Sequence, residues 1–306
     1  MNEQQAWGDF WAQDPRHKAP AGAGANGGGG CLPGQWSGIE AAQKAAWHGF
    51  AEHIAEAARV LDLATGDARA LAWLREVRSD LVLLGVDLAE QLPPAPAGIT
   101  TQGGVPMEAL PFDDGFAGAV ISQFGFEYGD VARTAAQIAR VLMPGGQVGL
   151  MVHRGDGPIL AHNLQRKAAI AWLLEDQAVL TTLSKALTSP QGGSAIAAQV
   201  ATALAVVGAD KFSANSPAWE IAEAMRRAII AGEPHGEPAV LAALEEIAAR
   251  AANELGRIAS LERACRVADD RAAIEVAFGA HGLTLLACAE VCEPSGRAFA
   301  DFLHFA

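Results

Sequence analysis

The chain has 306 residues, 51% of them hydrophobic, which is enough to bury a large core. Its formal net charge is −13 and no Lys/Arg cluster stands out, which argues against nucleic acid and anionic membranes as partners, because phosphate groups require concentrated positive charge. Neither a signal-peptide pattern nor an apolar run of membrane-spanning length occurs in the sequence. We therefore expect a soluble, cytoplasmic protein with no membrane partner.

The first segment, residues 1–57, is expected to be a helical arm that carries a glycine-rich loop. The stretch APAGAGANGGGGCLPG at 19–34 holds neither a helix nor a strand. No β-branched run precedes these glycines and no Lys-Ser/Thr follows them, so a flexible loop is favoured over a phosphate-binding loop. Helical spacing then follows at 37–57.

From residue 58 the pattern changes to short apolar runs that alternate with helical segments. The first strands and helices are expected at 59–64 (strand), 68–77 (helix), 81–87 (strand), 117–124 (strand), 130–142 (helix) and 146–153 (strand). A later helix and two strands are expected at 270–282, 283–292 and 297–306. Continuous apolar strands separated by helices are typical of a parallel sheet that is covered on both faces.

Between these two parts the strand signals cease. Residues 158–186 and 194–207 are rich in Ala and Leu, Ser216-Pro217 resembles a helix start, and 238–268 repeats apolar residues at steps of three and four. We therefore divide the chain into an α/β domain, 58–156 and 270–306, and a helical insertion, 157–269. The insertion suits a substrate cap, a homodimer contact, or both.

The four cysteines, Cys31, Cys265, Cys288 and Cys292, form no Cys-x-x-Cys pair. They are too few for a disulfide scaffold and lack the spacing of a zinc site, so we expect no metal. Cys288 and Cys292 stand at even spacing in an apolar run, which favours a strand in the core.

The stretch ARVLDLATGDARA at 58–70 predicts a strand, a turn that contains Gly66, and a helix. The first turn of that helix presents free backbone N–H groups, and Gly66 lets a ligand approach the backbone closely. Asp62 lies near the end of this strand and Asp87 closes the next one, where a carboxylate can accept both hydroxyls of an adenosine ribose. Alternatively, both acids are ordinary strand-end residues.

Two further motifs follow in order, MEALPFDDGFAGAVISQFGFEY at 107–128 and ARVLMPGGQVGLMVH at 139–153. With the turn and the acidic strand end, they resemble the class I S-adenosylmethionine-dependent methyltransferases, especially the branch of ubiquinone and menaquinone biosynthesis. The resemblance covers about 58–154 well and 270–306 in outline. It implies an α/β fold with a Rossmann-like, doubly wound sheet of seven strands, and S-adenosylmethionine as the cofactor.

The resemblance also implies roles for individual residues. Those expected at the methionine part of the cofactor are Asp62, Ala64, Thr65 and Gly66. Those expected at the adenosine are Asp87 on the ribose, Leu88 against the adenine, and Met107 and Glu108 at the adenine edge. Those expected to line the floor near the methyl group are Ser122, Gln123 and Phe124.

The chain departs from the family pattern at four positions. Ala64 and Ala68 replace the first and third motif glycines, which is tolerable where φ is negative. Pro106 stands where the family often has an aspartate that reads the adenine, and Gly118 replaces another common aspartate. A glycine-poor loop suits a cofactor without phosphates better than a dinucleotide, so methyl transfer is favoured over NAD(P)-dependent hydride transfer.

Methyl transfer depends mainly on in-line positioning, and a general base helps only where the acceptor must lose a proton. Candidates are Glu127, Tyr128, His153 and His162, among which we select His153 and Tyr128 as catalytic because strand ends converge on the ligand site. We expect an oxygen or nitrogen acceptor, with carbon third, on a small organic molecule or peptide. The alternatives are a non-catalytic ligand-binding protein and, last, an NAD(P)-dependent oxidoreductase.

Overall fold

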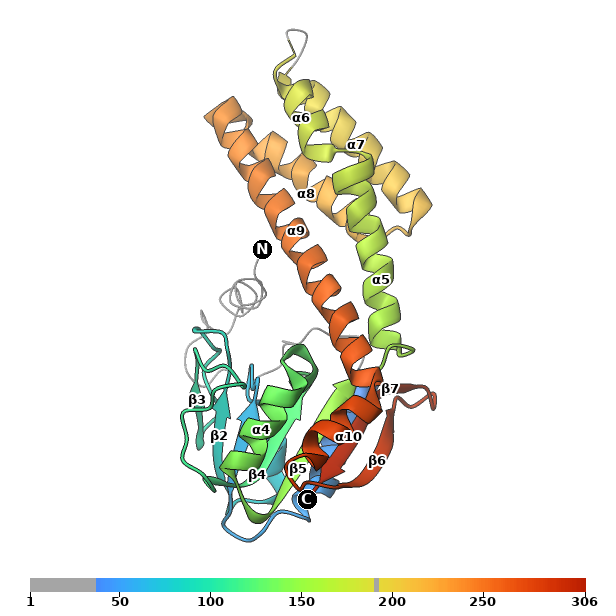
Figure 1. The fold of residues 1–306 in the computed structure, drawn as a ribbon. Coiled ribbons are helices and arrows are strands. Elements are labelled where there is room, and N and C mark those ends of the chain that lie inside the picture. The colour runs from blue at the N-terminus through green and yellow to red at the C-terminus, as the bar shows by residue number, and fades with distance from the viewer. Residues whose placement is uncertain (1–36, 190–192) are drawn as a thin grey trace. The chain divides into compact units, whose positions relative to one another are not determined.

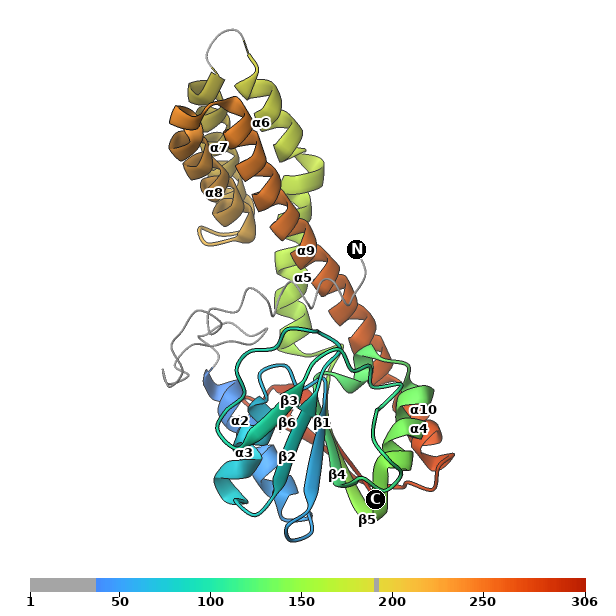
Figure 2. The ribbon, with the colours of Figure 1, turned by 90° about the vertical axis from the view of Figure 1, so that its left-hand side faces the viewer.

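The computed structural model describes residues 37–189 and 193–306. These form two compact units, which are drawn in Figures 1 and 2. The helical unit takes in 161–259, and the α/β unit takes in 37–160 and 260–306 of the described chain. The ends of the long helices that enter and leave the insertion therefore belong to the α/β unit.

The α/β unit is built on a sheet of seven strands in the order β3-β2-β1-β4-β5-β7-β6. The strands are β1 (Arg59–Leu63), β2 (Val82–Val86), β3 (Ile99–Gln102), β4 (Ala117–Gln123), β5 (Leu142–His153), β6 (Leu285–Cys292) and β7 (Ala298–Phe305). β1 to β5 pair in parallel, whereas β7 is antiparallel to both of its neighbours. The predicted Rossmann-like fold with seven strands is confirmed.

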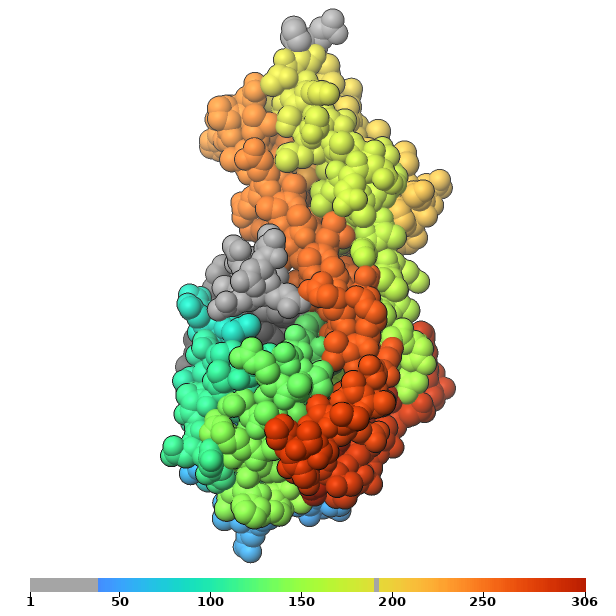
Figure 3. Space-filling model, in the orientation of Figure 1, coloured from blue at the N-terminus to red at the C-terminus, as the bar shows by residue number. Residues whose placement is uncertain are grey.

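Helices cover both faces of this sheet, as Figure 2 shows. One face carries α2 (Ser37–Ala51) and α3 (Arg69–Val77), and the other carries α4 (Val131–Val141) and α10 (Arg271–Gly279). Side chains alternate across each strand, so Val60 packs into the core under α2 and α3 whereas Leu61 packs into the core under α4 and α10. The surfaces of α4 and α10 adjoin in Figure 3.

The helix α2 belongs to the α/β unit, which corrects the predicted boundary at residue 57. Its Trp47 lies edge-on to Phe302 of β7, with ring centroids 4.9 Å apart, and Phe50 packs beside them. Trp47 also donates from Nε1 to Gln123 Oε1 at 2.6 Å. The aromatic residues of this helix therefore complete the sheet core. The rest of the predicted arm, with its glycine-rich loop, lies outside the described residues.

Two strands differ from their predictions. β3 was not predicted, because its four residues, ITTQ, are mostly polar and lie at the sheet edge. β6 forms the opposite edge, and Cys288 on it is exposed. The expectation that Cys288 lies in the core is wrong, because an edge strand lacks a neighbour on one side.

The helical unit is all-α among its described residues. Its helices are α5 (Pro158–Ala171), α6 (Val179–Leu187), α7 (Gly193–Lys211), α8 (Pro217–Gly232) and α9 (Glu237–Asp269). Ser216 caps α8 as predicted, accepting from the Trp219 N–H at 3.4 Å. The helix predicted over 158–186 is interrupted by a π-helical turn at Trp172–Asp176.

Helix α7 differs from the expectation that no segment of the chain is apolar over a membrane-spanning length. By length and composition alone, α7 is the helix among the described residues that is long and apolar enough to cross a bilayer. Core helices of water-soluble proteins pass the same test. Small buried residues of α7, such as Ala201 and Ala205, pack in the core of the helical unit.

Candidate functional site

The turn between β1 and α3 has a left-handed backbone at alternate positions. The φ angles are +55° at Ala64, +52° at Gly66 and +59° at Ala68. The two alanines therefore do not meet the condition of negative φ under which the sequence made them tolerable. The turn keeps the backbone that the motif glycines favour, and each alanine bears the steric cost of a left-handed conformation.

A glycine on the neighbouring strand end leaves room for the Ala64 methyl group. A Cβ placed on Gly125 would lie 2.4 Å from Ala64 Cβ and 3.0 Å from Ser122 Oγ. Because φ at Gly125 is −132°, the residue is glycine for space rather than for backbone freedom. The glycine in the sequence FGF at 124–126 is the sequence signal for this close packing, and it lies outside the residues expected at the site.

Asp62 lies beneath the turn and is only 2% exposed. Its Oδ2 accepts from Thr65 Oγ1 at 2.7 Å, whereas Oδ1 is buried and has no partner among the described residues. Burial raises the pKa of the Asp62 carboxyl to about 8, against the lowering effect of the Thr65 hydrogen bond. A buried carboxyl oxygen without a partner is costly, which points to a cationic or donor group as its missing partner.

Asp87 follows β2 and connects three segments. Its Oδ2 accepts from the Gly66 N–H at 2.9 Å and its Oδ1 accepts from the Ala89 N–H at 2.9 Å. Burial raises the pKa of Asp87, and these backbone hydrogen bonds oppose the rise. A third backbone N–H, that of Leu88, also acts on the carboxylate, which can accept about four hydrogen bonds in all and so keeps acceptor capacity for a ligand.

The segment after β3 runs beside Asp87. The Val105 N–H donates to the Asp87 carbonyl at 2.8 Å, and Glu108 Oε1 accepts from the Asp130 N–H at 3.0 Å. A Cβ on Gly129 would lie 2.9 Å from Met107 Sδ, so Met107 is close to the loop that follows β4. Leu88, next to Asp87, is 39% exposed, so a ligand can reach its side chain.

Ser122 and Gln123, predicted for the floor of the site, already have protein partners. Ser122 is fully buried, donates from Oγ to the Leu63 carbonyl at 2.9 Å and accepts from the Phe126 N–H at 3.0 Å. Gln123 Oε1 accepts from Trp47 Nε1. We assign these two side chains to support of the strand ends rather than to a ligand.

Phe124, His153 and Tyr128 gather at the ends of β4 and β5. Phe124 has a φ of +55° and donates from its N–H to the Met151 carbonyl at 2.7 Å. Its ring lies on the His153 ring with centroids 4.3 Å apart, and Tyr128 lies edge-on to His153 at 6.0 Å. The structure thus brings both predicted catalytic residues together. His162, which was not selected, belongs to the helical unit.

Three of the five non-glycine residues with positive φ in the described chain lie at this site: Ala64, Ala68 and Phe124. Such conformations cost free energy and concentrate at functional sites, where surrounding contacts hold them. The ends of β1, β2, β4 and β5 therefore form a strained, hydrogen-bonded cluster that carries three buried acids, Asp62, Asp87 and Glu127, and a histidine.

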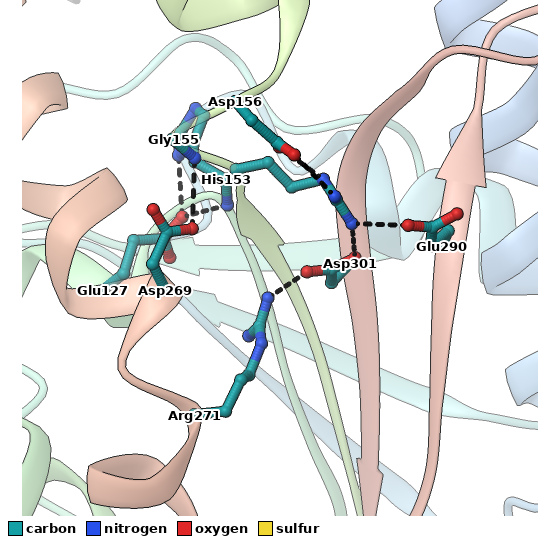
Figure 4. A network of polar contacts seen from close by, with 9 residues as sticks. Glu127, His153, Gly155, Asp156, Asp269, Arg271, Glu290 and Asp301 are labelled. Carbon is teal, nitrogen blue, oxygen red and sulfur yellow. Dashed lines mark hydrogen bonds and ion pairs between the residues drawn. The ribbon is translucent and has the colours of Figure 1, made fainter.

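A network of charged groups lies next to this cluster (Figure 4). Arg154, which follows His153, donates to Asp156 at 2.9 Å, Glu290 at 2.9 Å and Asp301 at 2.8 Å. Arg271 also pairs with Asp301. These ion pairs fix the chain where it leaves β5.

Part of the chain matches a known protein family. Residues 61–150 match the family described as methyltransferase domain. Comparison with curated proteins found no match.

Solved structures that resemble the chain include three methyltransferase structures. One is described as the complex of the Haloferax volcanii Trm112 methyltransferase activator with a methyltransferase (22% identity, 54% of this chain and 66% of that chain, TM-score 0.36). Another is an S-adenosylmethionine-dependent methyltransferase from Mesorhizobium loti (23%, 36% and 55%, TM-score 0.31). A third is the Burkholderia thailandensis 1,6-didemethyltoxoflavin-N1-methyltransferase with 1,6-didemethyltoxoflavin and S-adenosylhomocysteine bound (13%, 88% and 78%, TM-score 0.41). The chain thus spans less than two thirds of the length of the first two.

Proposed function

Because this chain contains a class I S-adenosylmethionine-dependent methyltransferase domain, we propose that it transfers a methyl group to an oxygen or nitrogen atom of a small organic molecule or peptide. The observation that carries the proposal is the pair of buried acids, Asp62 and Asp87, at the two strand ends that flank the left-handed turn. The branch of ubiquinone and menaquinone biosynthesis stays a prediction.

Asp62 suits the methionine end of the cofactor. That end carries an ammonium group, which can donate to Asp62 Oδ1, the buried oxygen that has no partner among the described residues. A positive charge there offsets the burial that now raises the pKa of the carboxyl. The orphaned oxygen therefore fits the cofactor that the sequence predicts.

Asp87 suits the ribose. Its two oxygens are held in place by the Gly66 and Ala89 N–H groups, so their remaining lone pairs point in defined directions. Two hydroxyl donors on neighbouring carbons match two acceptor oxygens of one carboxylate. The exposed Leu88 and the nearby Met107 would supply apolar contacts for the adenine.

S-adenosylmethionine, when bound, supplies a methyl group on a positively charged sulfur. The chain's own task is to orient the acceptor in line and to exclude water. His153, on β5, and Tyr128, after β4, are the groups that we assign to the acceptor side. We further propose that the protein acts in the cytoplasm, with homodimerisation through the helical unit as an additional proposal. The net charge of −13 supports an acceptor other than nucleic acid.

Calorimetric titration tests the proposal. S-adenosylmethionine and S-adenosylhomocysteine should bind the wild-type protein, whereas NAD should give no heat. Asp87→Ala should weaken S-adenosylhomocysteine binding by about 100-fold or more, since it removes two hydrogen bonds to a charged acceptor that are worth about 1.5–3 kcal/mol each. Asp113→Ala, which removes an exposed acid of the same unit, is the matched control and should bind normally.

Two results would overturn the assignment. Absence of heat with both sulfur cofactors would exclude the cofactor, and unchanged affinity in Asp87→Ala would exclude the proposed ribose contact. A protein that binds the cofactor but forms no S-adenosylhomocysteine with any oxygen or nitrogen acceptor would be a binding protein instead. Circular dichroism of Asp87→Ala separates lost binding from lost folding.

A further inference from the structure

Glu127 lies in the short turn Phe126–Tyr128 after β4 and is only 1% exposed. One of its oxygens, Oε1, makes two contacts with the same residue of β5. It accepts from the His153 backbone N–H at 2.9 Å and lies 2.7 Å from His153 Nδ1 (Figure 4). The carboxylate therefore contacts both the backbone and the ring of the predicted catalytic histidine.

This arrangement determines which ring nitrogen of His153 carries hydrogen. Oε1 is already an acceptor for the backbone N–H, as suits a carboxylate, and a carboxylate has no hydrogen to donate. Nδ1 must then be the donor in the 2.7 Å contact. In the neutral imidazole the hydrogen is consequently on Nδ1, and Nε2 keeps its lone pair.

The ring is also held in position from other sides. Phe124 lies against it with centroids 4.3 Å apart, and Phe124 itself adopts a left-handed backbone with φ of +55°. Beyond His153, the side chain of Arg154 is tied to three carboxylates, and the Gly155 N–H donates to Asp269 at 3.1 Å. The imidazole therefore has little freedom to rotate away.

The hydrogen bonding of the Glu127 carboxylate is incomplete. Its Oε2 is buried and has no partner among the described residues. His153 Nε2 likewise makes no hydrogen bond within the described chain. A buried, half-satisfied carboxylate is costly in a resting protein, but it stabilises a positive charge that forms next to it.

We propose that Glu127 is the positioning residue that holds His153 as a general base with Nε2 free to take a proton from the acceptor. The proposal rests on the proposed methyl transfer and deepens it. The group best served is a hydroxyl, because its oxygen is a weak nucleophile until the proton leaves, whereas a neutral amine attacks with its own lone pair.

The proposed reaction moves one proton and one methyl group. The hydroxyl proton goes to His153 Nε2, and the electron pair that it leaves on oxygen forms the new bond to the methyl carbon. The electrons of the bond that breaks would stay on the sulfur of bound S-adenosylmethionine, which would lose its positive charge. The imidazole becomes positively charged, and the Glu127 carboxylate beside Nδ1 offsets that charge.

The test is nuclear magnetic resonance of protein labelled with ¹⁵N-histidine, recorded at a pH where the imidazole is neutral. His153→Gln identifies the His153 signals among those of the eight histidines. We expect the hydrogen on Nδ1, both in the free protein and with S-adenosylhomocysteine added. A hydrogen on Nε2 in the wild-type protein would overturn the proposal without any variant.

Variants of Glu127 distinguish a role in orienting His153 from a role in stabilising the fold alone. Glu127→Gln keeps an oxygen that the backbone N–H requires as acceptor, so the Nδ1–H form should persist. Glu127→Met has no acceptor, so this form should be lost to a mixture of both forms, and an unchanged signal would contradict the proposal. Cys265→Ala is the matched control, because Cys265 is buried within the electrostatic reach of Glu127, and it should leave the signal unchanged.

The failure of this proposal and that of the proposed function give different results. Bound S-adenosylhomocysteine with hydrogen on Nε2 would exclude the base and leave the cofactor assignment intact. Hydrogen on Nδ1 without any cofactor binding would exclude methyl transfer, and with it the base role that we assign to His153.

Discussion

At the scale of single residues, the turn between β1 and α3 holds two alanines in a conformation that favours glycine. A left-handed backbone costs an L-residue about 1–2 kcal/mol, so Ala64 and Ala68 together store about 2–4 kcal/mol of strain. The residue types alone left the sign of φ open at both positions. What holds the alanines there is the surrounding structure, including the Thr65 N–H donating to the Val86 carbonyl at 2.9 Å.

Asp62 leads to a prediction about protons. Burial raises the pKa of its carboxyl to about 8, so in the free protein at pH 7 the group is mainly protonated. An ammonium group bound beside it would lower that pKa. We therefore predict that S-adenosylhomocysteine binding at pH 7 releases up to about one proton and becomes tighter as the pH rises toward 8.

Calorimetry in buffers of different ionisation enthalpy measures this proton release. The control is Asp62→Asn, which should release none and should lose the pH dependence. The raised pKa of Asp62 has the opposite effect on the folding stability of the free protein, which falls as the pH rises. A raised pKa stabilises the free protein below the usual carboxyl range, and this contribution is lost as the pH rises through about 8. Proton uptake on binding would contradict the assignment of Asp62 to the cofactor ammonium.

At the scale of elements, the turn after β1 and the end of β4 are fitted to each other. Gly125 has no side chain and so leaves room for the Ala64 methyl group. The Ser122 hydroxyl donates to the Leu63 carbonyl and so joins the ends of β4 and β1. The two elements are adjacent because β1 and β4 are neighbours in the sheet. A substitution on one side should therefore depend on the residue on the other.

We predict that Gly125→Ala destabilises the protein by about 1–3 kcal/mol, because the added Cβ would lie 2.4 Å from Ala64 Cβ. Ala64→Gly alone should be neutral or stabilising, since it relieves a left-handed alanine. The double variant should recover a large part of the loss, because two residues in contact are coupled.

Urea unfolding of the four proteins in this cycle provides the free energies. Ala72→Gly, within helix α3, serves as a reference for an ordinary alanine and should cost about 1 kcal/mol. If the two substitutions at 64 and 125 are strictly additive, the proposed contact does not determine the residue at either position.

Sequence patterns identified the elements with strong local signals. The apolar runs of β1, β2 and β4 and the cap of α8 by Ser216 are as predicted. β3 escaped prediction because an edge strand of four mostly polar residues lacks a pattern. The interruption at Trp172–Asp176 also escaped, because a π-helical turn has the composition of the helix around it.

At the scale of the whole molecule, the chain forms two compact units with separate cores. The residues that we assign to the cofactor all belong to the α/β unit. Binding should thus stabilise that unit selectively, by about 2.7 kcal/mol at a ligand concentration about 100 times Kd.

Amide hydrogen exchange with S-adenosylhomocysteine checks this prediction. We expect slower exchange in the turn after β1, at the end of β2 and around Met107, and no change in α6, α7 and α8. A comparable slowing throughout those three helices would show that the cofactor engages both units. Asp87→Ala, titrated with the same ligand concentration, is the control and should show little slowing.

The sequence alone determined the class of fold, the position of the turn after β1 and the acids at the strand ends, because strand period, glycine turns and motif order are local properties of the chain. Tertiary structure decided the rest. The φ angles of Ala64 and Ala68, the place of α2 on the sheet and the pairing of Glu127 with His153 all depend on residues distant in sequence. Trp47 and Gln123 are 76 positions apart, and Glu127 and His153 are 26 apart, and only folding brings each pair within hydrogen-bonding distance.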